Sequence, residues 1–409
     1  MYYRNIAHSS VGNNIIKAIE DYKKIADSTR TGSPLFDRLG ERKEIGTPED
    51  YRRIIPNIEE DSKYSTMFHN KKIDAGWTYF GQFITHDITI RREFGEIVPR
   101  LNLDCLYGLG QTSNGYLYDY QDNHSNHLPK GVCFALETYL KKDTNMLVYD
   151  VPRTGVEQSI PLMGDIRNDD NFLLSQLHCT FLRFHNQMVE FFYHREIVDP
   201  HELFKKTRQF VTWTYQWLII NEYLKLMTGK VSHDLISGQP SKILPVDSWN
   251  SLPVLLPEFI IAALRVGHSQ VRQSYRLNAI DISDLSLFSL GNNEPDLSGF
   301  KRDDRRGFID WSFFFHFDDQ KKVQKSRPMD LFLADSMNHV PLLGGQSRNM
   351  GEVNIRRSIE NKLVIMQDDM KVLRELGINS LGCFETELDA LYNSAYDILP
   401  VPYDRRHPP

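Results

Sequence analysis

The chain has 409 residues, of which 41% are hydrophobic and 25% are charged, and its formal net charge is −6. This balance is typical of a soluble globular protein and excludes a strongly basic nucleic-acid-binding surface. The length is sufficient for a large hydrophobic core.

No segment is predicted to span a membrane or to direct secretion. The first eight residues lack an apolar signal-peptide core. The most apolar run, 253–266, is interrupted by Pro257, Glu258 and Arg265, and it is shorter than the about 20 apolar residues that a bilayer requires. The scattered cysteines form no CxxC pair, which favours free thiols and a cytoplasmic location. They are Cys105, Cys133, Cys179 and Cys383.

Residues 1–70 are polar and rich in turn formers, which predicts an arm with short helices packed on the body. The alternative is a partly disordered tail. Residues 71–409 are predicted to form one large helical domain with few short strands, so the expected fold class is mainly α.

The first predicted helix covers residues 71–90. Gln82 and His86 are four residues apart and therefore share one face of this otherwise apolar helix. Two polar groups on such a face indicate a small polar site in an apolar cavity, although a satisfied core histidine is the common alternative.

Residues 91–160 have little helical periodicity and many turn formers, so loops and short strands are expected there. In the stretch from Arg100 to Asp104, polar and apolar residues alternate. This alternation predicts that the side chains of Asn102 and Asp104 point the same way.

Helical periodicity returns after Asp169. Further helices are predicted at 200–227, 257–268, 353–368 and 370–376. The helix at 257–268 is apolar on nearly all sides, which predicts a central position, and it ends at His268.

Lone imidazoles on apolar walls, such as His86 and His268, can bind a metal or a haem iron, and composition does not distinguish the two. A zinc-binding HExxH motif is absent, and no pair of Glu-x-x-His motifs indicates a dinuclear site.

Five segments combine polar or charged residues with apolar ones: Phe80-Gly81-Gln82-Phe83-Ile84-Thr85-His86-Asp87, Asn102-Leu103-Asp104-Cys105-Leu106-Tyr107-Gly108, the stretch from Gly164-Asp165-Ile166-Arg167 to His185-Asn186, Leu264-Arg265-Val266-Gly267-His268-Ser269, and Val353-Asn354-Ile355-Arg356-Arg357-Ser358. In this order, they resemble the motifs of the animal-type haem peroxidases, the peroxidase–cyclooxygenase superfamily. The stretch Asp310-Trp311-Ser312 is similar to bacterial members.

The resemblance implies a haem b whose iron is bound by His268. Asn354 would accept the other ring N–H of this histidine and make the imidazole a stronger electron donor. Arg265 and Arg357 would pair with the haem propionates. A structural salt bridge is the alternative for each arginine.

On the opposite face of the haem, the resemblance implies a general acid–base role for His86 toward hydrogen peroxide. Gln82 would hold a water molecule or a halide, and Arg167 would stabilise the negative charge that develops as the O–O bond breaks. Four residues of the third segment are expected to be buried structural groups: His178, Arg183, His185 and Asn186.

The resemblance also implies a calcium site formed by Asp87, the Arg100 carbonyl, Asn102 and Asp104. Asn102 replaces a carboxylate that is usual in the family, so a lower affinity is expected. The alternative is that Asn102 and Asp104 cap local turns.

Three positions depart from the family pattern. Thr85 replaces an aspartate that is esterified to haem in many members, and Asp170 replaces a glutamate that forms a second ester. Asn171 replaces the methionine that forms a sulfonium bond in the mammalian myeloid enzyme. The haem is therefore expected to be non-covalent or singly linked through Asp170, and chloride oxidation is not expected.

The implied function is a peroxidase that uses hydrogen peroxide to oxidise a small organic donor, a halide or a pseudohalide. The cyclooxygenase branch has a tyrosine three residues before the proximal histidine, and Arg265 stands there instead. An oxygenase acting on a lipid or specialised metabolite, or a non-catalytic haem-binding relative, remains an alternative. The sequence does not indicate the oligomeric state.

Overall fold

The structure is a computed structural model that describes residues 70, 72–90, 101–120, 127–141, 146–228, 257–281, 283–289, 295–302, 306–317, 323–329, 333–341 and 347–360. Its described part is mainly helical with a few short strands, as predicted. The division into an arm and a body stays a prediction, because all but residue 70 of the arm lies outside these ranges.

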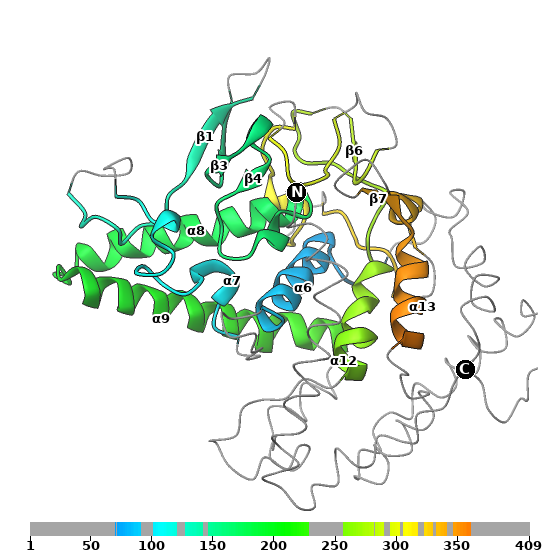
Figure 1. The fold of residues 1–409 in the computed structure, drawn as a ribbon, viewed down its shortest axis with the longest axis horizontal. Helices are drawn as coiled ribbons and strands as arrows, with labels where there is room; N and C mark the ends of the chain where they lie inside the picture. Colours follow the sequence, from blue (N-terminus) through cyan, green and yellow to red (C-terminus); the bar gives the residue numbers. More distant parts are fainter. Residues whose placement is uncertain are drawn as a thin grey trace, which may run out of the picture.

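Two long antiparallel helices form the base of the fold (Figure 1). Helix α8 (Phe172–Tyr193) begins after Asn171, whose side chain accepts a hydrogen bond from the Leu174 N–H. Helix α9 (Pro200–Leu218) begins after Asp199, which caps Glu202 in the same way, and it continues into a π-helical turn, η5 (Ile219–Tyr223). Such side-chain caps satisfy backbone donors that a helix start leaves unpaired. Both helices lie where the periodicity predicted them.

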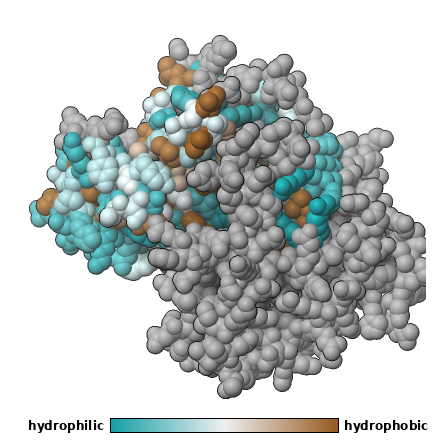
Figure 2. Space-filling view, viewed as in Figure 1, coloured by the Kyte–Doolittle hydropathy of each residue, from teal (hydrophilic) through white to brown (hydrophobic). Residues whose placement is uncertain are grey.

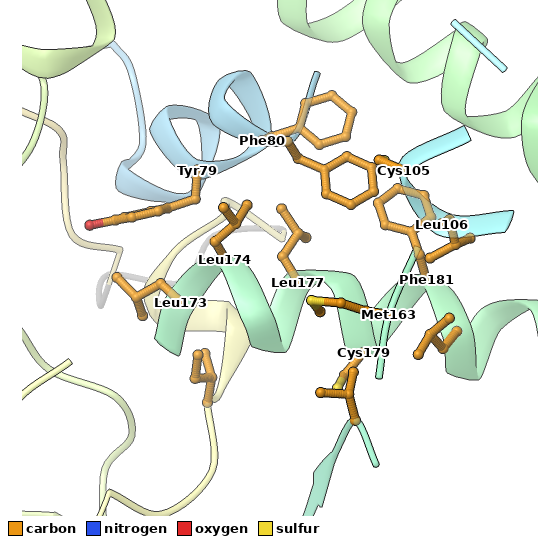
Figure 3. Packing of buried hydrophobic residues seen from close by; sticks show 14 of the residues in the cluster. Tyr79, Phe80, Cys105, Leu106, Met163, Leu173, Leu174, Leu177, Cys179 and Phe181 are labelled. Atoms are coloured by element: carbon orange, nitrogen blue, oxygen red, sulfur yellow. The ribbon is translucent and has the colours of Figure 1, made fainter. Parts of the chain in front are cut away.

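Helix α6 (Ala75–Ile88) packs on α8 through aromatic side chains. The rings of Phe83 and Phe181 stack at 5.1 Å, and Tyr215 of α9 meets both rings edge-on. In Figure 3, Leu174 and Leu177 of α8 point toward α6, whereas Cys179 points to the opposite side of α8. This packing fixes the rotation of α6 and therefore the direction of its polar residues.

The strands form four antiparallel hairpins of two strands each within the described residues. The pairs are β1 (Glu137–Leu140) with β2 (Leu147–Asp150), β3 (Arg153–Thr154) with β4 (Ile160–Pro161), β5 (Ser274–Tyr275) with β6 (Leu285–Ser286), and β7 (Val340–Pro341) with β8 (Ser347–Arg348). The remaining short helices are α7 (Asp104–Tyr107), η2 (Gly115–Leu117), η3 (Val156–Gln158), η4 (Ile166–Asp169), η7 (Trp311–Phe313) and η8 (Asp335–His339).

A buried arginine joins the hairpins to η4. Arg153 donates hydrogen bonds to both Asp150 and Asp169, at 2.7–3.2 Å, and all three residues are buried. Buried charges of this kind are stable only when they are paired. The pairing holds the turn that precedes α8 in place.

The prediction of a central helix at 257–268 was wrong. The segment is divided into α12 (Pro257–Ile261) and a tighter 3₁₀ helix, η6 (Ala263–His268), in which no residue is fully buried. The apolar residues of η6 line an open cavity, which explains both their hydrophobicity and their exposure, whereas Ile260 and Ile261 of α12 are buried.

The last described helix, α13 (Met350–Glu360), begins three residues before the predicted start at Val353. The remainder of that prediction, and the helix predicted at 370–376, lie outside the described residues. Figure 1 shows α13 beside α12 and η6.

The surface in Figure 2 is mainly hydrophilic over its described part, with smaller hydrophobic patches. Among the described helices, none combines the length and the hydropathy needed to cross a membrane. Cys105, Cys133 and Cys179 are buried free thiols, as predicted, and Cys383 lies outside the described part.

Candidate functional site

A cavity of about 1320 Å³, including its open mouth, lies between α6 and η6. One wall carries Gln82, Thr85 and His86, and the other carries Arg265 and His268. The two histidines that the sequence analysis singled out therefore line one cavity, although they are far apart in the chain.

The imidazole of His86 is oriented by a buried amide. Its Nδ1 lies 2.8 Å from Oδ1 of Asn168, and Nδ2 of Asn168 lies 3.1 Å from Nδ1 of His178. In this amide orientation, His86 donates its Nδ1–H to Asn168, which leaves Nε2 as the ring nitrogen that can accept a proton. Asn168, His178 and His185 are fully buried. Asn186 is half-buried, and the prediction of a buried group was wrong at Arg183, which is exposed. The sequence analysis did not identify Asn168 as a site residue.

Burial keeps both imidazoles neutral. It lowers the pKa of His86 to about 4, and the positive charge of Arg167 acts in the same direction. Burial also lowers the pKa of His178 to about 3. At neutral pH, His86 is therefore a base without a net charge.

Arg167 does not line the cavity. Its guanidinium donates to the Asp165 carboxylate, to Oγ1 of Thr89 at 3.0 Å and to the His86 carbonyl at 2.9 Å. The Asp165 side chain also accepts from the Arg167 backbone N–H at the start of η4. In this arrangement, Arg167 acts on the cavity through its charge and through the backbone of α6, and a direct contact with a bound peroxide stays a prediction.

On the other wall, His268 faces the amide of Asn354. Nδ2 of Asn354 lies 2.9 Å from Nδ1 of His268, and turning the amide over brings its oxygen to the same place. This pairing orients the ring and leaves Nε2 as the ligand nitrogen. Helices η6 and α13, which are 86 residues apart at this contact, supply the two side chains.

Positive charge gathers beside His268. Burial, together with the positive charges of Arg357 and Arg167, lowers the pKa of Arg265 to about 10. The Nε atom of Arg265 is buried and has no hydrogen-bond partner in the described part of the chain. An anionic group beside these arginines would relieve both penalties.

Three of the positions at which the chain departs from the family pattern, Thr85, Asp170 and Asn171, also lie at the cavity. Oγ1 of Thr85 donates to the Gly81 carbonyl at 2.9 Å, as Thr hydroxyls commonly do within helices. Nδ2 of Asn171 donates to Oε1 of Gln82 at 3.2 Å, which orients the Gln82 side chain. Asp170 lines the cavity beside Asn171.

The residues predicted to bind calcium are brought together in part. Both oxygens of Asp87 accept backbone N–H groups, from Leu103 and Cys105, at 3.1 Å. Burial raises the pKa of Asp87 to about 6, so a cation beside it would be stabilising. Oδ1 of Asn102 is buried without a partner among the described residues. Arg100 lies outside them.

The prediction of an extended stretch from Arg100 to Asp104, with the Asn102 and Asp104 side chains pointing the same way, was wrong at its C-terminal end. Leu103 has a left-handed backbone, with φ of 59°, and Asp104 begins helix α7. Asp104 lies 3.5 Å from the Arg208 guanidinium of α9. Calcium binding stays a prediction.

A model of the animal haem peroxidases matches residues 115–293. The match covers less than half of the chain and shows a similarity to this family. The matched part contains the third and fourth sequence segments, from Gly164 to Ser269. A finer placement among bacterial members stays a prediction.

Individual relatives match between 28% and 49% of the chain. Peroxidasin homolog pxn-2 of Caenorhabditis elegans is 26% identical over 190 residues, which are 45% of this chain and 14% of that protein. A peroxidase-like protein of Margaritifera margaritifera is 26% identical over 49% of this chain and 26% of its own length, and a chorion peroxidase of Aedes aegypti is 29% identical over 28% and 15%. The chain thus covers between 14% and 26% of the length of these three relatives.

Among solved structures, peroxidase A of Dictyostelium discoideum aligns with a TM-score of 0.47 at 15% identity, and the alignment covers 76% of this chain and 67% of that one.

The cavity fits the haem that the family implies. His268 could bind the iron from one side, with Asn354 orienting its ring. The unpartnered Nε of Arg265 is suited to a propionate, and the apolar lining from η6 and η8 is suited to a porphyrin face. His86 lies on the opposite wall, where a second reactant could bind.

Proposed function

We propose that the chain is a haem-dependent peroxidase that reduces hydrogen peroxide to water with two electrons from a small donor. The main support is that two histidines on opposite walls of one cavity each have their Nδ1 held by an amide. Bound haem would supply the redox centre and accept electrons from an organic molecule, a halide or a pseudohalide.

The proton chemistry belongs to His86. Nε2 of the neutral imidazole accepts a proton from peroxide, and the resulting imidazolium returns that proton to the departing oxygen, so no net proton stays on the protein. The hydrogen bond from Nδ1–H to Asn168 stabilises the charged ring between these two transfers. Gln82, oriented by Asn171, holds a water molecule or a halide beside the reacting oxygens.

Arg167 and Arg265 contribute electrostatically. Arg167, fixed by Asp165, adds positive charge beside His86 and favours the negative charge that develops on the breaking O–O bond. Arg265 and Arg357 bind the propionates, and His268 with Asn354 orients the haem.

Replacing the two histidines separately tests the proposal. His86→Ala is expected to slow the reaction of haem-loaded protein with peroxide about 10²–10⁴-fold without changing haem content. His268→Ala is expected to lose haem or to change its visible spectrum. An unchanged rate in the first variant removes His86 from the mechanism, and an unchanged spectrum in the second removes His268 as the iron ligand. Haem that is retained without any reaction with peroxide would indicate a binding protein.

The haem is proposed to be non-covalent or singly linked through Asp170, because Thr85 has no carboxylate for an ester. Extraction with acidified acetone separates these forms from a doubly linked haem. Wild-type haem that stays with the protein and is released in Asp170→Asn identifies the single link, and complete extraction from wild type identifies the non-covalent form. Haem retained by both proteins would contradict the proposal.

A further inference from the structure

Two imidazoles and one carboxylate converge on the surface at the C-terminal end of α8, the end away from α6 and α12 in Figure 1. Nε2 of His127 and Nε2 of His194 lie 2.9 and 3.0 Å from the same oxygen, Oε1 of Glu190. All three ligand atoms lie within 4.8 Å of one another. We refer to His127, Glu190 and His194 as the His–Glu–His cluster.

The convergence involves two distant segments. Glu190 and His194 are one turn apart at the end of α8, whereas His127 lies 63 residues before Glu190, in the segment that precedes β1. The two rings stack at 5.9 Å with an interplanar angle of 29°, which directs both Nε2 atoms toward Glu190.

The geometry is close to that of a metal site. Tetrahedral zinc with bonds of about 2.0–2.2 Å separates neighbouring ligand atoms by about 3.4 Å. The cluster therefore needs to open by about 0.5 Å on each side of Glu190 to admit an ion. Its side chains are 41–63% exposed, so small rotamer changes can provide this space.

The ligand types select the ion. Imidazole nitrogens suit zinc and other late divalent transition metals, whereas calcium and magnesium prefer oxygen ligands, of which the cluster offers one carboxylate. Three protein ligands leave one coordination position for water.

We propose that the His–Glu–His cluster binds one Zn²⁺ ion and thereby ties the segment before β1 to the end of α8. This site is separate from the haem cavity and does not depend on the peroxidase proposal. The alternative is that the three side chains form hydrogen-bonded ion pairs only.

Calorimetric titration of the purified full chain with Zn²⁺ tests the proposal, with Glu190→Gln and His194→Asn as the site variants. His316→Asn is the matched control, because His316 is exposed and lies in a different part of the fold. One equivalent of Zn²⁺ is expected to bind wild type and the control equally, at least tenfold more tightly than either site variant. Zn²⁺ is also expected to raise the melting temperature of wild type and the control more than that of the site variants.

X-ray absorption at the zinc edge is expected to show two imidazole ligands. Equal Zn²⁺ binding by all four proteins, or no stoichiometric binding to wild type, would overturn the proposal. All substitutions are at exposed or half-exposed positions, so loss of the fold would not produce either outcome.

Discussion

Replacing Asn168 by leucine removes the group that orients His86 while leaving the imidazole in place. Loss of the 2.8 Å hydrogen bond destabilises the Nδ1–H tautomer of His86 by about 1–2 kcal/mol, because the buried donor then has no partner. At about 1.4 kcal/mol per factor of ten, the fraction of the reactive tautomer falls about 5–30-fold. We expect the rate constant for the reaction of haem-loaded protein with peroxide, followed in the Soret band, to fall by the same factor.

Two further variants separate orientation from general damage to the fold. Asn278→Leu removes another fully buried asparagine, which hydrogen-bonds Asp281 and the Phe308 carbonyl away from the cavity, and its rate is expected to stay at the wild-type value. Asn168→Asp keeps an acceptor for the His86 N–H and is expected to react faster than Asn168→Leu. A wild-type rate in Asn168→Leu would refute the tautomer argument. A rate above wild type in Asn168→Asp would show that the Asn168 amide has the opposite orientation.

Two other predictions concern haem affinity and acid stability. Arg265→Gln is expected to weaken haem binding about 10–100-fold, because one charge-assisted hydrogen bond contributes about 1.5–3 kcal/mol. Transfer of haem to an acceptor protein measures this affinity. The same affinity in wild type and variant would exclude a propionate contact. Burial lowers the pKa values of His178 and His185 to about 3 and 4, below that of an exposed histidine. As the pH falls below about 6.5, the unfolded chain therefore binds more protons at these two positions than the folded chain does. Their contribution to stability is complete above about pH 6.5 and is lost toward pH 4, at up to about 1.4 kcal/mol per pH unit for each histidine. The raised pKa of Asp87 has the opposite effect, because the folded chain binds one more proton there than the unfolded chain. Guanidinium unfolding at pH 7, 6 and 5 measures the summed effect of the three groups on the free energy of unfolding. Stability that rises on acidification would contradict the lowered pKa values of the two histidines.

The sequence predicted the parts of the site that depend on local spacing. The four-residue interval between Gln82 and His86 was enough to place both on the cavity wall, because α6 is a regular helix. The family resemblance supplied the pairing of His268 with Asn354, which no local pattern contains.

Other features depended on tertiary contacts that periodicity does not encode. The apolar character of residues 257–268 predicted a buried helix, but the same composition suits the wall of a cavity. Asn168 lies in a polar turn where any residue could face solvent, and only the packing of α6 on α8 brings it to His86 and His178. The turn at Leu103 was missed because a left-handed conformation is rare for a non-glycine residue.

The π-helical turn η5 bears on how this protein could diverge. A π turn holds one residue more than the α-helical turn it replaces, so it changes the direction of every side chain that follows. Tyr223 and Met227, both on the cavity wall, come at or after this turn, and a methyl group on Gly81 would collide with the Tyr223 hydroxyl. Because a π turn accommodates its extra residue within one turn, deleting a residue between Ile219 and Glu222 would restore a regular helix and leave both side chains facing the cavity. Converting η5 into an α-helical turn without a deletion would instead rotate both side chains by about 100°. A substitution outside the chamber that removed the π turn could thus reshape the chamber while every amino acid facing it kept its identity.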